Sequence, residues 1–332
     1  MFRKLFNRVL GGRDDDAHPD IHVAAFGKHP GWTDHMEELG LDTPGLVNLR
    51  RKLYTEGISQ NIDSGTWQQL DPTHRLERFQ HVFVWKVGRS MVIGRLWSSS
   101  DGRGRQLYPM IVAVHGTSLS TLRTLETAYP LLEAAQPDFM AVREASAVRQ
   151  RLDRLHLALR GRLTELAGHD DAEQSPNGTL AALVNHPDLG PDHEGMLRIM
   201  YQLEREFTAF RASTAEARSF AEEPGPRPQH IRVPLCGDDA LTGIRRWLKY
   251  FGQQLHAQAP LLLIAPLDTQ WIDVICGMPT ASQLACLRTT LDRHPLTTSI
   301  PYSISEDVRT RLRQEVEGMG GTVSRAESTE NP

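Results

Sequence analysis

The sequence predicts an α/β sandwich that carries a helical insertion in the middle of the chain. Strand-like segments occur near both ends, whereas residues from about 119 to 220 follow a helical pattern. The chain has 332 residues, of which 39% are hydrophobic and 23% are charged. This composition is typical of a globular protein that can bury a substantial core.

Before the insertion, the sequence predicts four strands and one helix. Residues 46–57 place leucine and tyrosine side chains at the spacing of one buried helix face. Apolar and β-branched runs indicate the strands, and the second and third of them form a hairpin that turns at 88–90. Two or three of these strands together could form an antiparallel face. The candidate strands cover 21–26, 81–87, 91–97 and 108–114.

The insertion is predicted to be a series of helices rich in arginine. Helical spacing runs from 119 to 167, and four leucines in it indicate one buried face: Leu152, Leu155, Leu159 and Leu163. The arginines alternate with acidic residues, which is typical of a solvated helix face. After a polar break, Asn177 could cap a short helix that ends near Val184, and a further helix is expected over 194–210.

Residues 221–229 contain three prolines and are the predicted linker into the last part of the chain. Strands are expected after it at 231–235, 261–265 and 271–276. Helices are expected at 238–255, at 280–291, and from a capping box at Ser303–Glu306 to about Gly318.

The two ends of the chain differ from the rest. Residues 1–10 place apolar side chains at helical spacing with basic residues elsewhere, and 11–16 form a linker. This amphipathic segment could make weak peripheral contact with an anionic membrane, enter a partner's groove, dock on its own core or fray. The polar tail at 321–332 is expected to be disordered.

Charge and cysteine usage exclude several classes of function. The net charge is -4, with 37 basic and 41 acidic residues, so the sequence does not predict general nucleic-acid binding. Cys236, Cys276 and Cys286 have no short paired spacing, which argues against a zinc site and a disulfide framework. A reducing cytoplasm fits this pattern best. The apolar runs are too short to span a bilayer, and no secretory signal is recognised at the N-terminus.

The first segment that could carry chemistry runs from Phe26 to His35, directly after a predicted strand. Gly27 and Lys28 suggest a phosphate loop, but the required GxxxxGK followed by Ser or Thr is absent, and Pro30 removes a backbone amide. His29, Asp34 and His35 could be imagined as metal ligands, yet no second cluster supports them. We therefore expect neither a cofactor nor a metal.

The second segment runs from Trp97 to Pro109 and contains a serine-rich turn. Asp101 and the glycines favour a tight turn, in which Arg105 could pair with Asp101 or with another carboxylate. A hydrolase that uses His29, Asp34 or Ser99 remains an alternative. No GxSxG elbow or other positional signature links these serines to a base such as His81 or His115.

Taken together, the two segments resemble motifs of the TagF family, which are accessory regulators of bacterial type VI secretion. The first resembles the family's Gly-Lys-x-Pro followed by an aspartate, and the second resembles Ser-x-Asp-x-x-Gly-Arg followed by an aromatic residue and proline. Thr33 and His35 stand where the family tends to have glycine and an aromatic residue, which indicates a divergent branch. The matching residues are Gly27, Lys28, Pro30, Asp34, Ser99, Asp101, Gly104, Arg105, Tyr108 and Pro109.

The resemblance implies a three-layer α/β sandwich with a mixed or antiparallel sheet over residues 17–320. It further implies a cytoplasmic, non-enzymatic regulator that acts through protein contacts, with a forkhead-associated scaffold protein as its expected partner. On this interpretation the two motifs are adjacent loops, and Lys28, Asp34, Asp101 and Arg105 form one hydrogen-bonded cluster. The cluster could be a binding surface or could only hold the loops together. A binding or scaffold protein of another system is the alternative function.

Overall fold

The computed structural model describes residues 20–88, 90–117, 121–167, 176–211 and 225–320. The predicted N-terminal helix and linker (1–16) and the tail (321–332) lie outside the described residues. The same is true of 221–224, the first part of the predicted proline-rich linker.

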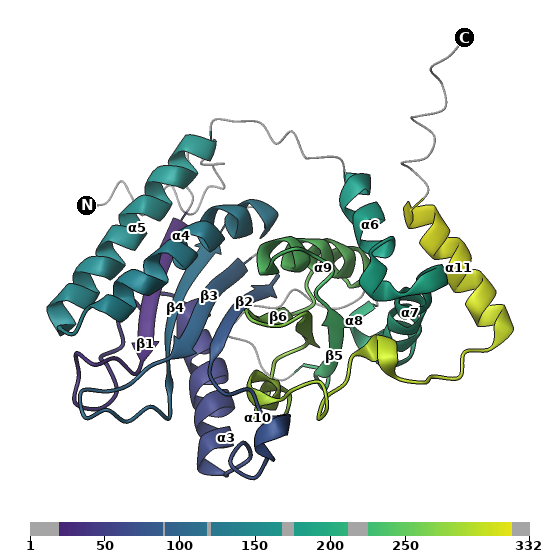
Figure 1. The fold of residues 1–332 in the computed structure, drawn as a ribbon. Helices are drawn as coiled ribbons and strands as arrows, with labels where there is room; N and C mark the ends of the chain where they lie inside the picture. Colours follow the sequence, from purple (N-terminus) through teal and green to yellow (C-terminus); the bar gives the residue numbers. More distant parts are fainter. Residues whose placement is uncertain (1–19, 89, 118–120, 168–175, 212–224, 321–332) are drawn as a thin grey trace.

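Seven strands form one sheet in the order β1-β4-β3-β2-β6-β7-β5 (Figure 1). Every pair of neighbouring strands is antiparallel, so the described sheet is antiparallel and not mixed. The strands are β1 (Asp20–Gly27), β2 (Gln80–Val87), β3 (Ser90–Ser98), β4 (Pro109–Thr117), β5 (Gln229–Pro234), β6 (Leu261–Pro266) and β7 (Trp271–Cys276).

The sheet joins the parts of the chain that precede and follow the insertion. β2 pairs with β6 from His81↔Pro266 to Lys86↔Leu261. All six residues of β6 are buried, which fits a central strand covered on both faces. Strands near both ends of the chain therefore supply a single sheet.

Helices precede β2, fill the insertion and follow β5. The first group is α2 (Pro44–Leu49), the π-helical η1 (Arg50–Ser59), α3 (Gln60–Asp63) and the 3₁₀ turn η2 (Pro72–His74). The insertion contains α4 (Thr121–Ala141), α5 (Ala145–Ala167), α6 (Pro176–Val184), η3 (Pro187–Leu189), η4 (Pro191–His193), α7 (Glu194–Glu206) and α8 (Thr208–Arg211). The last group is α9 (Ala240–Gln254), α10 (Ala281–Leu284), η5 (Ala285–Arg288), η6 (Thr297–Ser299) and α11 (Glu306–Gly320).

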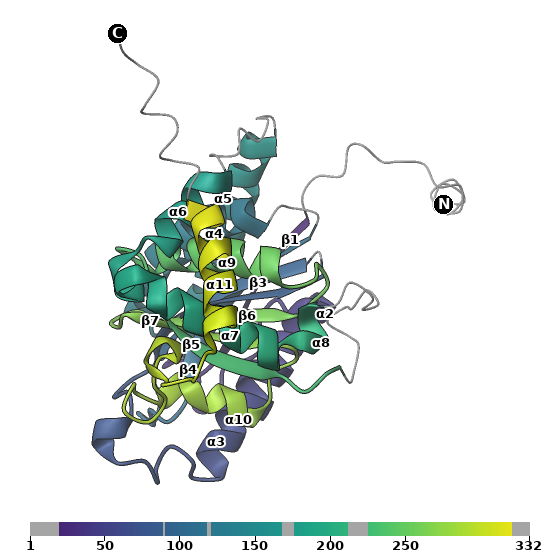
Figure 2. The same cartoon turned by 90° about the vertical axis from the view of Figure 1, so that its right-hand side faces the viewer.

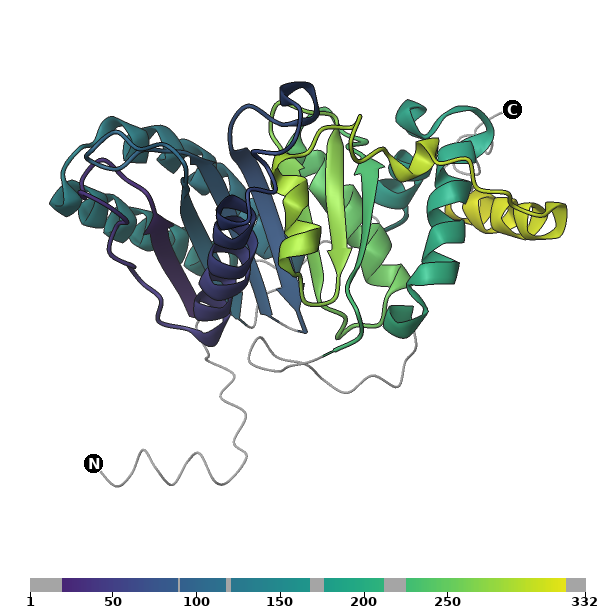
Figure 3. The same cartoon turned by 90° about the horizontal axis from the view of Figure 1, so that it is seen from below.

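Two apolar cores lie on opposite faces of the sheet. Along β1, Val23 and Ala25 belong to one core, whereas Ala24 and Phe26 belong to the other, as the alternation of side chains along a strand requires. The first core includes side chains of α4, α5 and α9, and the second includes side chains of α2, η1 and α10. Figures 1 and 3 show these helices on the two sides of the sheet.

Beyond β5, the remaining helices extend the first core. Side chains of α6, α7 and α11 belong to it, among them Leu183, Met200 and Leu312. Figure 2 looks onto this end of the molecule, with α11 in front. No helix in the described ranges is both long and apolar enough to cross a membrane.

The helix predicted over 46–57 is longer than expected. It begins at Pro44, where the Thr43 hydroxyl accepts a hydrogen bond from the Leu46 amide, and it continues through η1 and α3 to Asp63. The helix predicted over 280–291 is shorter. Thr280 caps it, but the helix ends at Arg288 because Thr289 is extended and pairs with Arg75.

Two predicted helix starts are wrong. Asn177 does not precede its helix, because that helix already begins at Pro176, and proline is favoured in a first turn. The capping box at Ser303 does not open α11. The Arg309 amide donates to the Ser305 carbonyl, and the helix begins at Glu306.

Two segments with a predicted helical pattern are interrupted in the structure. The segment 119–167 contains a break between α4 and α5, and the segment 194–210 contains a break at Phe207. The Phe207 side chain is fully buried, and its backbone leaves helical geometry at φ -101° and ψ 16°. Packing of this side chain into the core accompanies the break.

Candidate functional site

The first motif loop begins where β1 ends, and the second motif loop runs from the end of β3 to the start of β4, the neighbour of β1. Gly27, the last residue of β1, lies opposite Met110 in β4, and the Lys28 amide donates to the Pro109 carbonyl at 3.0 Å. Gly27 has φ +110°, and a Cβ atom there would lie 2.2 Å from the Pro109 oxygen. Only glycine fits at this position, because it tolerates the positive φ and leaves room for the Pro109 carbonyl.

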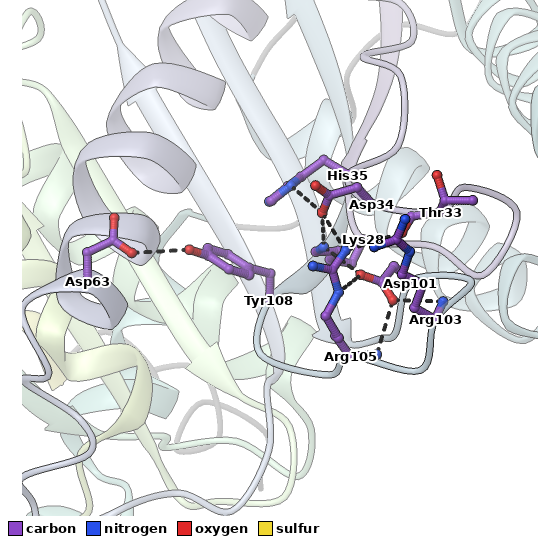
Figure 4. A network of polar contacts seen from close by, with 9 residues as sticks. All are labelled: Lys28, Thr33, Asp34, His35, Asp63, Asp101, Arg103, Arg105 and Tyr108. Carbon is purple, nitrogen blue, oxygen red and sulfur yellow. Dashed lines mark hydrogen bonds and ion pairs between the residues drawn. The ribbon is translucent and has the colours of Figure 1, made fainter.

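Lys28 and Asp101 form a buried ion pair between the loops (Figure 4). The distance from Lys28 Nζ to Asp101 Oδ2 is 2.8 Å, and the two side chains are 4% and 0% exposed. Lys28 Nζ also donates to Asp34 Oδ1 at 2.5 Å. A buried ion pair needs such additional hydrogen bonds, because both charges have lost their water.

Asp101 organises the second loop through both carboxylate oxygens. Its Oδ1 accepts from the amides of Arg103 and Arg105 at 3.0 and 3.1 Å, and its Oδ2 accepts from Arg105 Nε at 2.7 Å. Burial by itself raises the pKa of Asp101, but hydrogen bonds from Lys28 and Arg105 outweigh it, and the net pKa lies well below the usual range. The carboxyl is therefore ionised, and it accepts from both cations.

Asp34 and Arg105 form the exposed side of the same cluster. Arg105 Nη2 lies 3.0 Å from Asp34 Oδ1 and 3.2 Å from the Thr33 carbonyl oxygen. Their side chains are 65% and 51% exposed. The hydrogen bond from Lys28 is the main reason that the pKa of Asp34 is lowered. The sequence offered Asp101 or another carboxylate as the partner of Arg105, and in the structure Arg105 pairs with both Asp101 and Asp34.

Aromatic side chains pack beside the cluster. The His35 and Tyr108 rings are 5.0 Å apart, and Lys28 Nζ lies 6.0 Å from the centre of the Tyr108 ring. The Tyr108 hydroxyl donates to Asp63 Oδ1 at 3.3 Å, which links the second loop to α3. Burial, followed by the charge of Lys28, lowers the pKa of His35, so this ring is neutral at pH 7.

The loops also touch through their backbones. The Gly102 amide donates to the Trp32 carbonyl at 2.6 Å, and a Cβ atom on Gly102 would lie 3.1 Å from the carbonyl oxygens of Pro30 and Trp32. Gly104 differs, because its φ of +80° favours glycine while nothing lies within 4 Å of a Cβ atom there. The structure thus brings the predicted motif residues of both loops into one contact region.

His29 is engaged on both ring nitrogens. Nδ1 accepts from the Gly31 amide at 3.0 Å, and Nε2 donates to the Phe139 carbonyl at 3.1 Å. Burial lowers its pKa, so the ring is neutral. Neither nitrogen is left for a serine hydroxyl or for a metal shared with Asp34 and His35.

Ser99 follows β3, and no hydrogen bond among the described residues joins it to His81, His115 or Asp101. His115 bonds with the Thr43 hydroxyl at 2.8 Å and lies six residues along β4 from Pro109, about 20 Å away. His81 is fully buried, which lowers its pKa to about 3. Asp101 is held by Lys28 and Arg105. Ser99 instead lines a cleft.

This cleft, of about 780 Å³, lies beside the two loops. Pro30 contributes from the first loop, and Ser99 and Leu107 contribute from the second. Met140 at the end of α4 and Arg288 in η5 contribute from other parts of the chain. The cleft also contains Arg75, Arg78 and Arg143. The sequence did not indicate any of these arginines as site residues, since no local motif contains them.

A second polar cluster lies inside the sheet, away from the motifs. Arg232 in β5 and Asp273 in β7 are register partners, with Nε–Oδ1 and Nη2–Oδ2 distances of 2.8 and 2.9 Å. His230 Nε2 donates to Asp273 Oδ1 at 2.9 Å, and the His294 ring stacks on the His230 ring at 4.5 Å. By residue type His230, Asp273 and His294 could hold a metal, but the Arg232 guanidinium already occupies both carboxylate oxygens. One charged residue inside each of two apolar strands was the signal that could have revealed this pair.

Comparison with known proteins finds no family model and no curated protein that matches this chain. The resemblance to the TagF family therefore rests on the two motifs and on their order along the sequence. The contacts between the two loops provide the further support for a function.

Proposed function

We propose that the protein is a non-enzymatic, cytoplasmic accessory protein that regulates bacterial type VI secretion through protein–protein contacts. The observation that carries this proposal is the cluster of Lys28, Asp34, Asp101 and Arg105. These four residues come from the two motifs that resemble the TagF family, and they form one hydrogen-bonded unit. A chance match of short motifs would not require their side chains to meet.

The fold supports the same proposal. We infer that residues 17–320 form the three-layer α/β sandwich of the family, with the antiparallel sheet as its middle layer. The two apolar cores on opposite faces of the sheet support this arrangement. Side chains of α4, α5 and α9 belong to one core, and side chains of α2, η1 and α10 belong to the other.

The cluster suits a surface that binds another protein. Its buried half, Lys28 and Asp101, fixes both loops, and its exposed half presents Asp34 and Arg105. Loops that are already held in one conformation lose less entropy on binding. Leu107 is 50% exposed in the same loop as Arg105, so an apolar contact and an arginine are available side by side.

The proposal is tested with the forkhead-associated scaffold protein encoded by the same genome. Titration calorimetry of the two purified proteins is expected to show a complex, and deletion of the gene is expected to change the amount of secreted tube protein in the culture medium. Absence of a complex together with unchanged secretion would contradict the proposal. A stable complex with a protein of an unrelated system would favour the alternative binding role.

A further inference from the structure

Basic side chains from separate parts of the chain line the cleft beside the motif loops. Four of its lining residues are arginines and one is acidic, whereas the whole chain carries a net charge of -4. The arginines are Arg75, Arg78, Arg143 and Arg288, and the acid is Glu77. The cleft therefore concentrates positive charge on a protein that has none in surplus.

Arg75 and Arg288 lie on adjacent backbone segments. The Leu76 amide donates to the Arg288 carbonyl at 2.9 Å, and Arg288 Nε donates back to the Leu76 carbonyl at 2.8 Å. Burial, followed by the charge of Arg75, lowers the pKa of Arg288 to about 10. Within the described ranges, neither guanidinium is paired with a carboxylate; Arg75 donates to the Trp67 carbonyl instead.

Arg143 adds a further basic side chain to the lining of the cleft. It follows α4, its side chain is exposed, and it lowers the pKa of the neighbouring His29. No described carboxylate forms an ion pair with it. No described carboxylate therefore neutralises Arg75, Arg143 or Arg288, although Arg75 donates to the Trp67 carbonyl and Arg288 to the Leu76 and Glu77 carbonyls. Arg78 differs, because it pairs with the exposed Asp268 at 3.1 Å.

Exposed apolar side chains flank the same cleft. Leu107 is 50% exposed in the second motif loop, and Met140 is 52% exposed at the end of α4. They are two of the four most exposed large hydrophobic side chains in the part of the chain that the structure describes. Single exposed apolar residues are ordinary, but two beside one arginine-lined cleft indicate a contact that is both apolar and charged.

We propose that this cleft is the docking site for a short peptide segment of a partner protein, in which carboxylate side chains stand beside an apolar side chain. The carboxylates would meet Arg75, Arg143 and Arg288, because arginine binds carboxylates through paired hydrogen bonds. The apolar side chain would lie against Leu107 and Met140. The volume of about 780 Å³ suits a few side chains of a peptide. This inference rests on the proposed role in protein contact and assigns it a surface and a ligand chemistry.

The test uses the full chain and a phage library of random short peptides. Selection is expected to enrich peptides that place Glu or Asp beside Leu, Ile or Phe. Fluorescence anisotropy then measures the affinity of a synthetic peptide with the enriched sequence. Replacing its Asp and Glu residues by Asn and Gln is expected to weaken the binding. Its affinity should also fall as the salt concentration rises, since charge attraction is screened.

Variants locate the binding. Arg143→Glu and Met140→Asp change exposed side chains and leave the fold intact. Each substitution is expected to lower the affinity for the peptide by about fivefold or more. The matched controls are Arg313→Glu on α11, which changes another exposed arginine, and Leu157→Asp on α5, which changes another exposed apolar residue. Both are expected to keep the wild-type affinity. Circular dichroism confirms that all four variants are folded.

Several outcomes would overturn the inference. One is enrichment of peptides without acidic residues, another is equal binding to the Arg143→Glu and Met140→Asp variants, and a third is no enrichment at all. Complete displacement of the peptide by inorganic phosphate at low concentration would instead identify a small anion as the occupant. If the scaffold protein binds while no acidic peptide does, the cleft assignment fails and the proposed function stands. The reverse result contradicts the type VI assignment alone.

Discussion

Lys28 and Asp101 lie 73 residues apart in the sequence, and their side chains form a buried ion pair with an Nζ–Oδ2 distance of 2.8 Å. The pair ties the loop after β1 to the loop after β3. Asp34 and Arg105 complete the cluster on its exposed side. The position of both loops, and of the cleft wall that they form, depends on this contact.

Asp101→Ala is therefore expected to lower the melting temperature by about 5 °C or more, because it leaves Lys28 buried without its partner. It also removes the acceptor of the Arg103 and Arg105 amides. Asp101→Asn keeps an oxygen that can accept from these amides, so it is expected to lower the melting temperature less than Asp101→Ala does. Thermal unfolding followed by circular dichroism ranks the two variants, and equal melting temperatures for wild type and Asp101→Ala would contradict this role.

Gly27→Ala is expected to destabilise the fold by about 2–4 kcal/mol, because the new Cβ atom meets the Pro109 carbonyl and the φ of +110° is strained. Gly104→Ala is the matched control. Gly104 also has a positive φ, but a Cβ atom there meets nothing within 4 Å, so the cost should be about 1 kcal/mol. Urea denaturation measures both values, and similar costs for the two variants would argue against the close approach at Gly27.

Asp273→Asn is expected to cost about 3–5 kcal/mol, since it leaves the fully buried Arg232 charge without a carboxylate. Asp268→Asn breaks the pair with Arg78, in which both side chains are 67% exposed, and is expected to cost less than about 1 kcal/mol. Free energies of unfolding from urea titrations compare the two pairs. A small cost at Asp273 would show that the sheet does not depend on this ion pair.

The free energy of unfolding is expected to fall as the pH is lowered, and protonation of His294 is expected to account for part of this loss. Burial, followed by the nearby charge of His230, lowers the pKa of His294 from 6.5 to about 4. Arg232 acts in the same direction and Asp273 opposes it. Between these pH values the unfolded chain binds the proton and the folded chain does not, so the free energy of unfolding decreases as the pH falls.

The full shift of the His294 pKa corresponds to about 3–4 kcal/mol of stability. His294→Gln removes this titration, so its stability should depend less steeply on pH than that of the wild type. Urea unfolding across the window from pH 6.5 to about 4 provides the comparison. Parallel pH profiles for the two proteins would exclude His294 as a source of the acid sensitivity.

Local patterns predicted most of the strands. Residues 261–265 and 271–276 are short apolar runs, and the structure forms strands at Leu261–Pro266 and Trp271–Cys276. The hairpin over 81–87 and 91–97 was also predicted to within one residue at each end. The pairing of β2 with β6 was not predicted, because no local signal states which distant strand completes a sheet.

The site was predictable only in part, for the same reason. Lys28, Asp34, Asp101 and Arg105 were expected to meet, since the resemblance to the TagF family implied that the two motifs form adjacent loops. Arg75, Arg143 and Arg288 each resemble an ordinary surface arginine in the sequence, and only folding places them around one cleft.

We propose that the outer surface of the two motif loops binds a protein. Leu107→Asp and its control Leu157→Asp each place a charge at an exposed leucine, 50% and 68% exposed in the wild type. The direct measurement is the dissociation constant of the forkhead-associated scaffold protein for each variant. We predict that Leu107→Asp weakens the complex by about tenfold or more while Leu157→Asp leaves it unchanged. Equal affinities for wild type and both variants would contradict a binding role for these loops.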